Sequence, residues 1–391
     1  MGLVMRWYGV QSIPGVTYSF FRQGHSHVAF LGWGYLAIIV LMIEQFLPKE
    51  RILCPRYQWN LIFTTIFIAG MIFSFPLLGY KTISIVLLSL FLVTSVVFVV
   101  YFLKDYSKVE KRGISHYFLA AAFVWYLLSG VGPFALGPIV VFYGKGDLYH
   151  LAVYYYLHFL YNGFFVFGIG ALFFRLLEQR GVAYSVKKAK YFFWLSASAC
   201  LPAYALSTLW IEVPFLVVAI AFLAALLQII SIVYLISLVK GIELGLDFWV
   251  KGLLKTVLSV YVVKLVFQLL SAIPSLSVMV YEAKSFVVVG YIHLVTLGLI
   301  SLFLLSWLLL SSSFSMKSRI ARLGLSLFLS GFLATEALLF LRGLFQWLAY
   351  TGFESFFLWL AIFSSLMPLG IFLFLIGQII KGRNNRSFPA K

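Results

Sequence analysis

The chain has 391 residues, of which 63% are hydrophobic and 10% are charged, and its formal net charge is +17. A water-soluble domain carries about 25% charged residues, so this composition excludes a soluble globular fold and makes lipid the solvent of much of the surface. The lysines and arginines are spread along the chain rather than gathered on one polar segment, which argues against nucleic acid as a partner.

Long apolar runs follow one another along the whole chain. Each is long enough to cross the hydrocarbon core, which takes a helix of about 20 residues. A membrane β-barrel is excluded, because it needs shorter segments that alternate strictly between apolar and polar residues. We therefore predict an all-α polytopic transmembrane helix bundle of about eleven helices, with residues 1–391 in a single integral membrane domain. The predicted spans cover 27–47, 61–79, 83–103, 116–141, 151–174, 191–210, 213–239, 250–273, 286–310, 323–349 and 353–380.

Basic residues fall in alternate connections between these spans, which by the positive-inside rule are cytoplasmic. This orientation puts the N-terminus outside and the C-terminus in the cytoplasm. The first 26 residues contain no run long enough to span and no signal-peptide pattern, and the odd number of crossings leads us to expect a twelfth helix upstream of Met1 in relatives or in the complete reading frame. The residues that define the orientation are Lys49, Arg51, Arg56, Lys104, Lys108, Lys111, Arg112, Arg175, Arg180, Lys187, Lys188, Lys190, Lys240, Lys251, Lys317, Arg319, Arg322, Lys381, Arg383, Arg386 and Lys391.

Motifs of soluble enzymes are missing from the sequence. No phosphate-binding, dinucleotide-binding or nucleophile-elbow motif occurs in a strand–turn–helix context. Cys54 and Cys200 form neither a metal-ligand pattern nor a recognisable disulfide framework. Candidate chemistry is therefore sought in the histidines.

Five of the six histidines lie at or near the outer ends of predicted spans. Ionisable residues inside a membrane usually face the interior of a bundle and mark functional sites. Neutral imidazole binds haem iron and copper, and two imidazoles from facing helices can hold a haem between them. Interfacial anchoring is the alternative, which we favour for His25 and His150, whereas ligation is favoured for His27, His158 and His293.

Glycines follow two of these histidines closely. Gly32 and Gly34 come after His27, and Gly298 comes five positions after His293. Small residues admit close neighbours. These glycines either leave room for the edge of a macrocycle or allow two helices to pack closely.

Three segments carry a resemblance to a known family: His25–Trp33, Tyr156–Gly163 and Tyr291–Gly298. They resemble the catalytic subunits of the haem–copper oxidase and nitric oxide reductase superfamily, and they are also similar to NnrS-type membrane haem proteins. In the oxidases the second and tenth helices supply the ligands of the low-spin haem, and the sixth supplies a copper ligand. With one helix added upstream, the spans that bear His27, His158 and His293 take these places.

The resemblance implies a 12-helix fold from which the first helix is missing here. It further implies a b-type haem held by His27 or His25 together with His293. A second metal, copper or iron, would be bound by His158, with His150 nearby.

The chain departs from the oxidase pattern at two places. The span 191–210 has no paired histidine, and Tyr291 stands where the family has a second histidine. The resemblance therefore implies a divergent or degenerate member without a complete haem–copper centre.

Other polar residues in or near spans indicate an interior path. Glu336 and Lys264 could form a buried pair, which would serve either as a lock between helices or as part of a proton route. Arg22 is either a partner for haem propionates or an ordinary flanking arginine. The tyrosines at 154–156 and 161 either donate hydrogen bonds near His158 or belong to an interfacial belt. The set of polar residues is Glu44, Gln228, Lys264, Gln268, Glu336 and Arg342.

Two classes of function remain open. The first is an integral membrane haem protein, an oxidoreductase that transfers electrons or binds or reduces O₂ or NO, with a redox partner or accessory subunit, in the bacterial inner membrane. The second is a multi-pass transporter or channel without haem. The span 116–141, which contains Pro133 and Pro138 among several glycines, would then be a broken helix that lines the path. An internal repeat between the two halves would favour the second class, and none is evident by eye.

Overall fold

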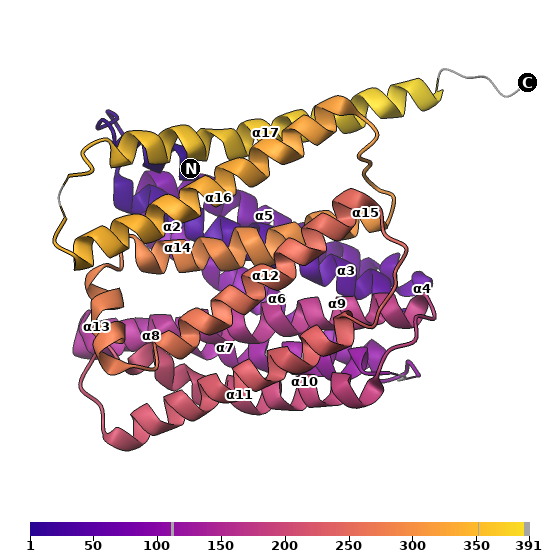
Figure 1. Ribbon diagram of the computed structural model, residues 1–391, viewed down its shortest axis with the longest axis horizontal. Helices are drawn as coiled ribbons and strands as arrows, with labels where there is room; N and C mark the ends of the chain where they lie inside the picture. The colour runs from indigo at the N-terminus through magenta and orange to yellow at the C-terminus, as the bar shows by residue number, and fades with distance from the viewer. Residues whose placement is uncertain (111–112, 351, 387–391) are drawn as a thin grey trace, which may run out of the picture.

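The computed structural model describes residues 1–110, 113–350 and 352–386 as a bundle of helices laid side by side (Figure 1). Among the described residues, ten helices are long and apolar enough to cross a membrane. The chain is therefore an integral membrane protein of the all-α class, as predicted. Lys111, Arg112 and Lys391, which contributed to the orientation argument, lie outside the described residues.

The elements follow in chain order. They are α1 (Gly2–Tyr8), α2 (Tyr18–His27), η1 (Val28–Tyr35), α3 (Leu36–Phe46), α4 (Lys49–Ile52), α5 (Pro55–Leu78), α6 (Thr82–Tyr106), α7 (Ser115–Tyr143), α8 (Asp147–His158), η2 (Phe159–Phe165), α9 (Val166–Gln179), α10 (Val186–Cys200), η3 (Pro202–Thr208), α11 (Phe215–Val239), α12 (Phe248–Leu270), α13 (Pro274–Glu282), α14 (Val287–His293), η4 (Leu294–Ser301), α15 (Leu302–Leu310), α16 (Arg319–Trp347) and α17 (Phe356–Arg386).

Local sequence explains where several helices begin and end. Asp247 caps α12 by accepting a 2.9 Å hydrogen bond from the backbone N–H of Trp249. Pro55 occupies the first turn of α5, where a helix needs no N–H. The same helix stops at Gly79, whose φ of 61° is a conformation that favours glycine.

The sixth crossing is a composite of two helices rather than one. Within the predicted span 191–210, α10 ends at Cys200 and Pro202 begins the 3₁₀-helix η3. At about 1.5 Å per residue for an α-helix and about 2.0 Å for a 3₁₀-helix, the two extend about 36 Å. The Tyr204 hydroxyl donates a 3.0 Å hydrogen bond to the backbone oxygen of Leu151 in α8, near the start of the fifth crossing. Together the two helices are long enough to cross the membrane, although neither is long enough alone.

The fourth crossing is continuous. α7 runs through Pro133 and Pro138 as one α-helix of 29 residues. Both prolines lie in its C-terminal half, where each removes one backbone donor without ending the helix. The broken span considered from the sequence does not form.

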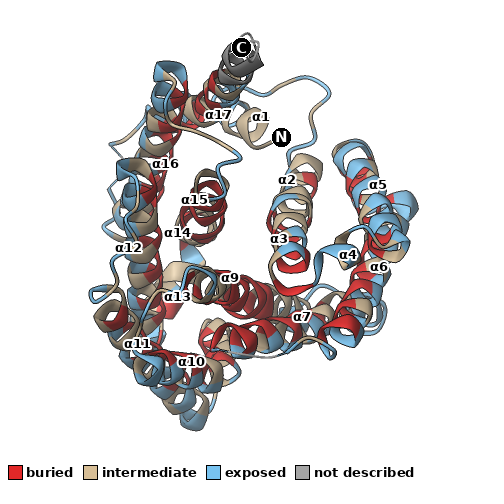
Figure 2. Cartoon of the chain, turned by 90° about the vertical axis from the view of Figure 1, so that its right-hand side faces the viewer, coloured by how far each residue is buried: buried red, intermediate tan, exposed pale blue. Residues whose placement is uncertain are grey.

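Three crossings form the inside of the bundle: α2–η1–α3, α8–η2–α9 and α14–η4–α15. Figure 2 shows them within a ring of the other helices. The most apolar stretch is 83% buried in Asp147–Gln179 and 61% buried in Val287–Leu310. It is 44% buried in Tyr18–Phe46, a value that the ring helix Arg319–Trp347 also has, and 28% buried in Pro55–Leu78 of the ring. These are the first, fifth and ninth crossings. Three outer crossings follow each of the first two, and two follow the third.

Each inner span changes into a π-helix directly after a histidine. η1 begins after His27, η2 after His158 and η4 after His293. π-helical turns are rare and frequently occur at functional sites. The internal repeat of this fold is therefore threefold, and it is centred on the inner histidines.

A glycine stands five positions after each of these histidines, at Gly32, Gly163 and Gly298. A Cβ at Gly163 would lie 2.4 Å from the Cβ of Trp125 in α7, and one at Gly298 would lie 2.7 Å from Cζ of Phe332 in α16. A Cβ at Gly32 would lie 3.0 Å from the nearest side chain of α5. In each repeat the glycine lets an outer helix approach the π-helix closely.

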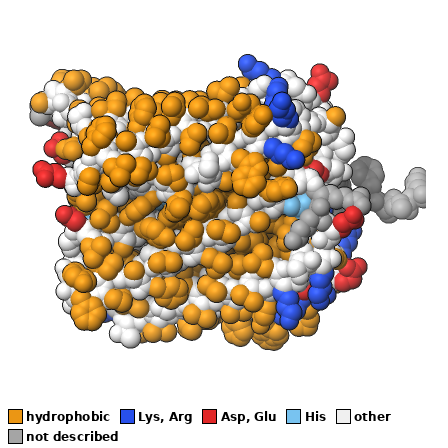
Figure 3. All heavy atoms as spheres, turned by 90° about the horizontal axis from the view of Figure 1, so that it is seen from below, with side chains coloured by type: hydrophobic (Ala, Val, Ile, Leu, Met, Phe, Trp, Pro, Cys, Tyr) orange, Lys and Arg blue, Asp and Glu red, His pale blue; other side chains and the backbone are white. Residues whose placement is uncertain are grey.

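The surface divides into a broad apolar band and two polar ends. Figure 3 shows hydrophobic side chains over the middle of the viewed face, with lysines and arginines gathered at its right-hand end. This distribution is that of a protein whose middle is surrounded by acyl chains.

Candidate functional site

Two histidines from different inner spans face each other at one end of the bundle. His25 in α2 and His293 at the end of α14 have ring centroids 6.5 Å apart, with ring planes inclined at 75°. Of the four ring nitrogens, Nδ1 of His293 has a hydrogen-bonding neighbour within the described residues, which is Nη2 of Arg6. This pair is the closest approach between histidines that the structure shows across two inner spans.

The short helix α1 lies over this pair. A Cβ added at Gly2 would lie 3.1 Å from Cε1 of His25, and Nη2 of Arg6 lies 3.3 Å from Nδ1 of His293. The indole of Trp7 anchors α1 to α17 by a 3.2 Å hydrogen bond to Ser365 Oγ. Burial lowers the pKa of Arg6, against the opposing effect of Tyr18 and Glu336. The N-terminal segment thus contributes a partly buried guanidinium to the site.

Glu336 brings a carboxylate to the same place from α16. Its Oε1 lies 3.8 Å from Nδ1 of His293, and the residue is 6% exposed. Neither carboxylate oxygen accepts a hydrogen bond from any described residue. The suggested pair with Lys264 is not formed, because Lys264 donates its hydrogen bond to Gln268 Oε1 at 2.7 Å.

Arg342 lies two turns further along α16. Its guanidinium stands over the rings of Phe286 and Phe356, at 5.7 and 5.9 Å from their centroids. Its Nε is buried and has no hydrogen-bond partner among the described residues. After Arg6, it is a second cationic group towards this end of the bundle, and it comes from the helix that carries Glu336.

His27 points away from the pair. Its Nε2 is 2.8 Å from the hydroxyl of Tyr80, and its ring packs 4.6 Å from that of Phe75. Burial raises the pKa of Tyr80 to about 12, so at neutral pH this hydroxyl is protonated and can donate. The structure therefore joins His25, rather than His27, to His293.

His158 has its own buried environment. Its Nε2 donates a 2.8 Å hydrogen bond to the backbone oxygen of Cys200, and its Nδ1 accepts one of 3.1 Å from Asn162 Nδ2. Both ring nitrogens are therefore engaged by the protein. A metal ion could bind this imidazole only after one of these hydrogen bonds breaks.

The remaining candidates lie elsewhere. His150 sits among aromatic rings, with Tyr149 and Trp210 centroids at 5.5 and 6.2 Å. Arg22 is exposed on α2. His116 is buried, and its ring stacks on Tyr106 and hydrogen-bonds its hydroxyl.

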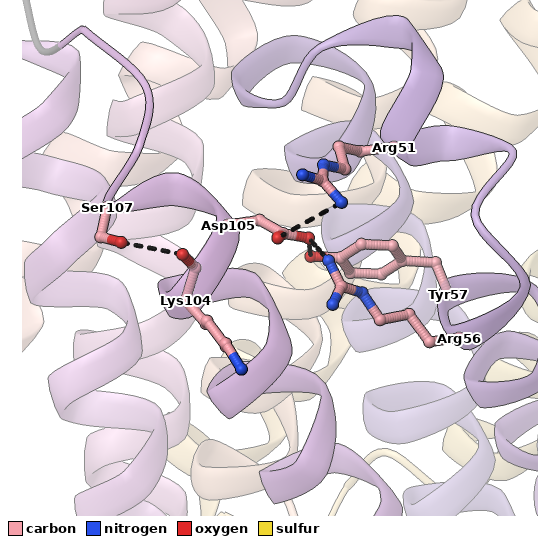
Figure 4. A network of polar contacts seen from close by, with 6 residues as sticks. All are labelled: Arg51, Arg56, Tyr57, Lys104, Asp105 and Ser107. Carbon is pink, nitrogen blue, oxygen red and sulfur yellow. Dashed lines mark hydrogen bonds and ion pairs between the residues drawn. The ribbon is translucent and has the colours of Figure 1, made fainter.

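A different buried carboxylate holds the other end of the bundle together. Asp105 at the end of α6 accepts hydrogen bonds from Arg56 and from the Tyr57 hydroxyl, the latter at 2.9 Å. Nη1 of Arg51 lies 3.8 Å from its other oxygen. Figure 4 shows the three side chains of α4 and α5 converging on this one group of α6.

Comparison with known protein families and with curated proteins finds no match to this chain. Within the described residues no group of three or more histidine, cysteine, aspartate and glutamate side chains is placed to hold a metal ion. The site must therefore be judged from its own geometry, which supplies two imidazoles rather than a cage of ligands.

Sequence reasoning missed Arg6 and misassigned the neighbour of Glu336. Arg6 lies in a segment too short to span, so no rule for membrane helices draws attention to it. A histidine followed by a glycine five residues later occurs in all three inner spans. Read across all three inner spans, that repeat could have revealed the threefold order.

Proposed function

We propose that this chain is an integral membrane haem protein in which His25 and His293 supply the two axial ligands of one haem iron. The observation that carries the proposal is the facing pair of imidazoles at 6.5 Å. A metal held by one nitrogen of each ring lies about 2 Å from each nitrogen, and each ring centre lies about 1 Å further back, so centroids about 6 Å apart are expected. The two rings fit such a group.

The surroundings of the pair also suit a haem. Its propionates need cations, and Arg342 offers a buried guanidinium nitrogen without a partner near the outer side of the bundle. His293 directly precedes the π-helix η4, and π-helical turns are frequent at functional sites. His158 is left out of the proposal, because both its nitrogens are already hydrogen-bonded.

If both imidazoles bound the iron of one haem, no position would be left for a diatomic ligand, so the role that fits best is electron transfer. A haem bound there supplies a one-electron ferric–ferrous couple. The chain's contribution is to fix the two imidazoles on separate inner spans and to keep the group in a low-dielectric interior. We place the protein in the bacterial inner membrane with its C-terminus in the cytoplasm, a proposal supported by the basic end seen in Figure 3.

The deciding experiment is an absorption spectrum of the protein purified after haem-replete expression, oxidised and then reduced with dithionite. We expect haem in the parent, its loss in His25→Ala and in His293→Ala, and its retention in His27→Ala, the control two residues from His25 on the same helix. A colourless parent would overturn the haem function and favour the transporter. Full haem content in both His25→Ala and His293→Ala would overturn the ligand assignment.

A further inference from the structure

The two neighbours of His293 Nδ1 make opposite demands on it. Arg6 has only N–H donors, so its 3.3 Å contact requires Nδ1 to be an acceptor without a proton. Glu336 at 3.8 Å has only acceptor oxygens when ionised, so it favours a proton on Nδ1. A neutral imidazole carries one proton, and therefore it can satisfy only one of the two.

The choice between them determines whether Nε2 can bind a metal. With Nδ1 unprotonated, the proton sits on Nε2 and blocks its lone pair. With Nδ1 protonated, the Nε2 lone pair is available. Histidines that bind metals generally donate their other ring N–H to a carboxylate or carbonyl, which fixes the tautomer and makes the ligand more basic.

Glu336 has the properties of such an acceptor. It is buried, its Oε1 lies 3.8 Å from Nδ1 of His293, it also interacts electrostatically with Arg6, and both of its oxygens lack a hydrogen-bond donor within the described residues. A buried carboxylate without a partner is costly. When the proton of His293 moves from Nε2 to Nδ1, the Nδ1–H becomes a donor for Glu336, and the imidazole gains no further proton.

We propose that Glu336 is the positioning residue that holds His293 in its Nδ1–H tautomer for metal binding through Nε2, while Arg6 favours the opposite tautomer in the metal-free protein. The inference rests on the proposed function and adds to it the control of one axial ligand. The imidazole keeps one proton in both states. Only the ring nitrogen that carries the proton changes.

The first test measures haem affinity and midpoint potential in Glu336→Leu and Glu336→Gln. We expect Glu336→Leu to lose about ten- to hundredfold in affinity and Glu336→Gln to lose less, because an amide oxygen still accepts the Nδ1–H. Loss of the anion weakens the ferric state more than the ferrous state. Each tenfold difference between the two raises the potential by about 59 mV.

Matched variants separate this role from general damage. Thr335 is the adjacent buried residue of α16, and its hydroxyl bonds only the backbone of its own helix at Phe332. Thr335→Val is expected to leave both quantities unchanged. Arg6→Gln is expected to raise haem affinity, since it removes the donor that competes for Nδ1.

A second test replaces the imidazole itself. In His293→Ala, added imidazole can donate an N–H to Glu336, whereas 1-methylimidazole cannot. We expect imidazole to restore the parent's spectrum at a lower concentration, and we expect this advantage to vanish in His293→Ala with Glu336→Leu. If neither compound restores the spectrum, the potential of Glu336→Gln decides the matter.

The outcomes distinguish this inference from the proposal beneath it. A parent without haem overturns both. A parent with haem whose affinity and potential are unchanged in Glu336→Leu and Glu336→Gln overturns the role of Glu336 alone. Equal rescue by imidazole and 1-methylimidazole has the same consequence.

Discussion

Two buried carboxylates, one at each end of the bundle, differ in their partners. Asp105 is 4% exposed and Glu336 is 6% exposed, so both are removed from solvent to a similar extent. Asp105 has hydrogen bonds or ion pairs with three side chains of α4 and α5. Glu336 has one histidine at 3.8 Å and no hydrogen bond within the described residues.

The difference separates a structural charge from a functional one. A carboxylate whose partners are all present joins helices. It contributes to stability, because its removal would leave the partner arginines without a counter-charge. A carboxylate that lacks a donor costs stability in the metal-free protein. In the proposed haem site, the N–H of a metal-bound His293 would supply the missing donor.

The largest effect is expected at the complete network. Asp105→Asn leaves Arg56 and Arg51 without a counter-charge, and we expect it to lower the free energy of unfolding by about 3 kcal/mol, at the low end for a broken pair because both arginines are partly exposed. Denaturant titration in mixed micelles measures this. The exposed Asp147→Asn is the control, with a change of less than about 0.5 kcal/mol. Equal effects of the two variants would contradict the structural role.

The next effect tests the close approach at the second π-helix. A Cβ at Gly163 would lie 2.4 Å from Trp125 Cβ, whereas one at Gly130 in α7 would meet nothing within 4 Å. Gly163→Ala should destabilise the protein by about 2 kcal/mol through overpacking, and Gly130→Ala should be neutral or stabilising by up to about 1 kcal/mol. Thermal unfolding of the two variants side by side gives the comparison, and a harmless Gly163→Ala would refute the packing argument.

A smaller effect of opposite sign is expected at Glu336. In haem-free protein, Glu336→Gln replaces a buried carboxyl group whose oxygens have no hydrogen-bond donor within the described residues, so we expect it to stabilise the fold by about 1 kcal/mol. The measurement is the same denaturant titration used for Asp105→Asn. If Glu336→Gln destabilised the haem-free protein as much as Asp105→Asn, the contrast between the two carboxylates would be lost.

The smallest effect is expected at Tyr80. Tyr80→Phe removes the 2.8 Å hydrogen bond to His27 and should cost about 1 kcal/mol or less. The haem spectrum should not change, because His27 is not a ligand in the proposed site. A shifted spectrum in Tyr80→Phe would instead return His27 to the ligand pair.

The fold was largely predictable because lipid imposes a simple rule on sequence. Apolar runs of about 20 residues must become helices, and the structure contains ten of them among its described residues. The division of the sixth crossing into two helices was not predictable, because hydropathy does not distinguish an α-helix from the 3₁₀-helix that begins at Pro202. The π-helices were also beyond reach, because periodicity alone does not distinguish them from α-helix over one or two turns.

The candidate site was predictable only in part. The depth of each histidine in the membrane follows from the boundaries and direction of its span. This reasoning predicted that His25, His27 and His293 lie at the same end of the bundle. Which of two neighbours on one helix faces His293 depends on rotation about the helix axis, and a π-helical turn changes that rotation. Arg6 comes from a segment outside the spans, so its arrival beside His293 depends on tertiary packing alone.

The order of synthesis gives the position of α1 a further consequence. Arg6 and His293 are separated by 287 positions in sequence, and Glu336 follows later still. During insertion into the membrane, the first half of the site must wait until the ninth and tenth crossings have emerged and packed. If the proposed haem site is right, the haem would be loaded only near the end of biogenesis, and we expect a truncated product that lacks the last three crossings to retain none.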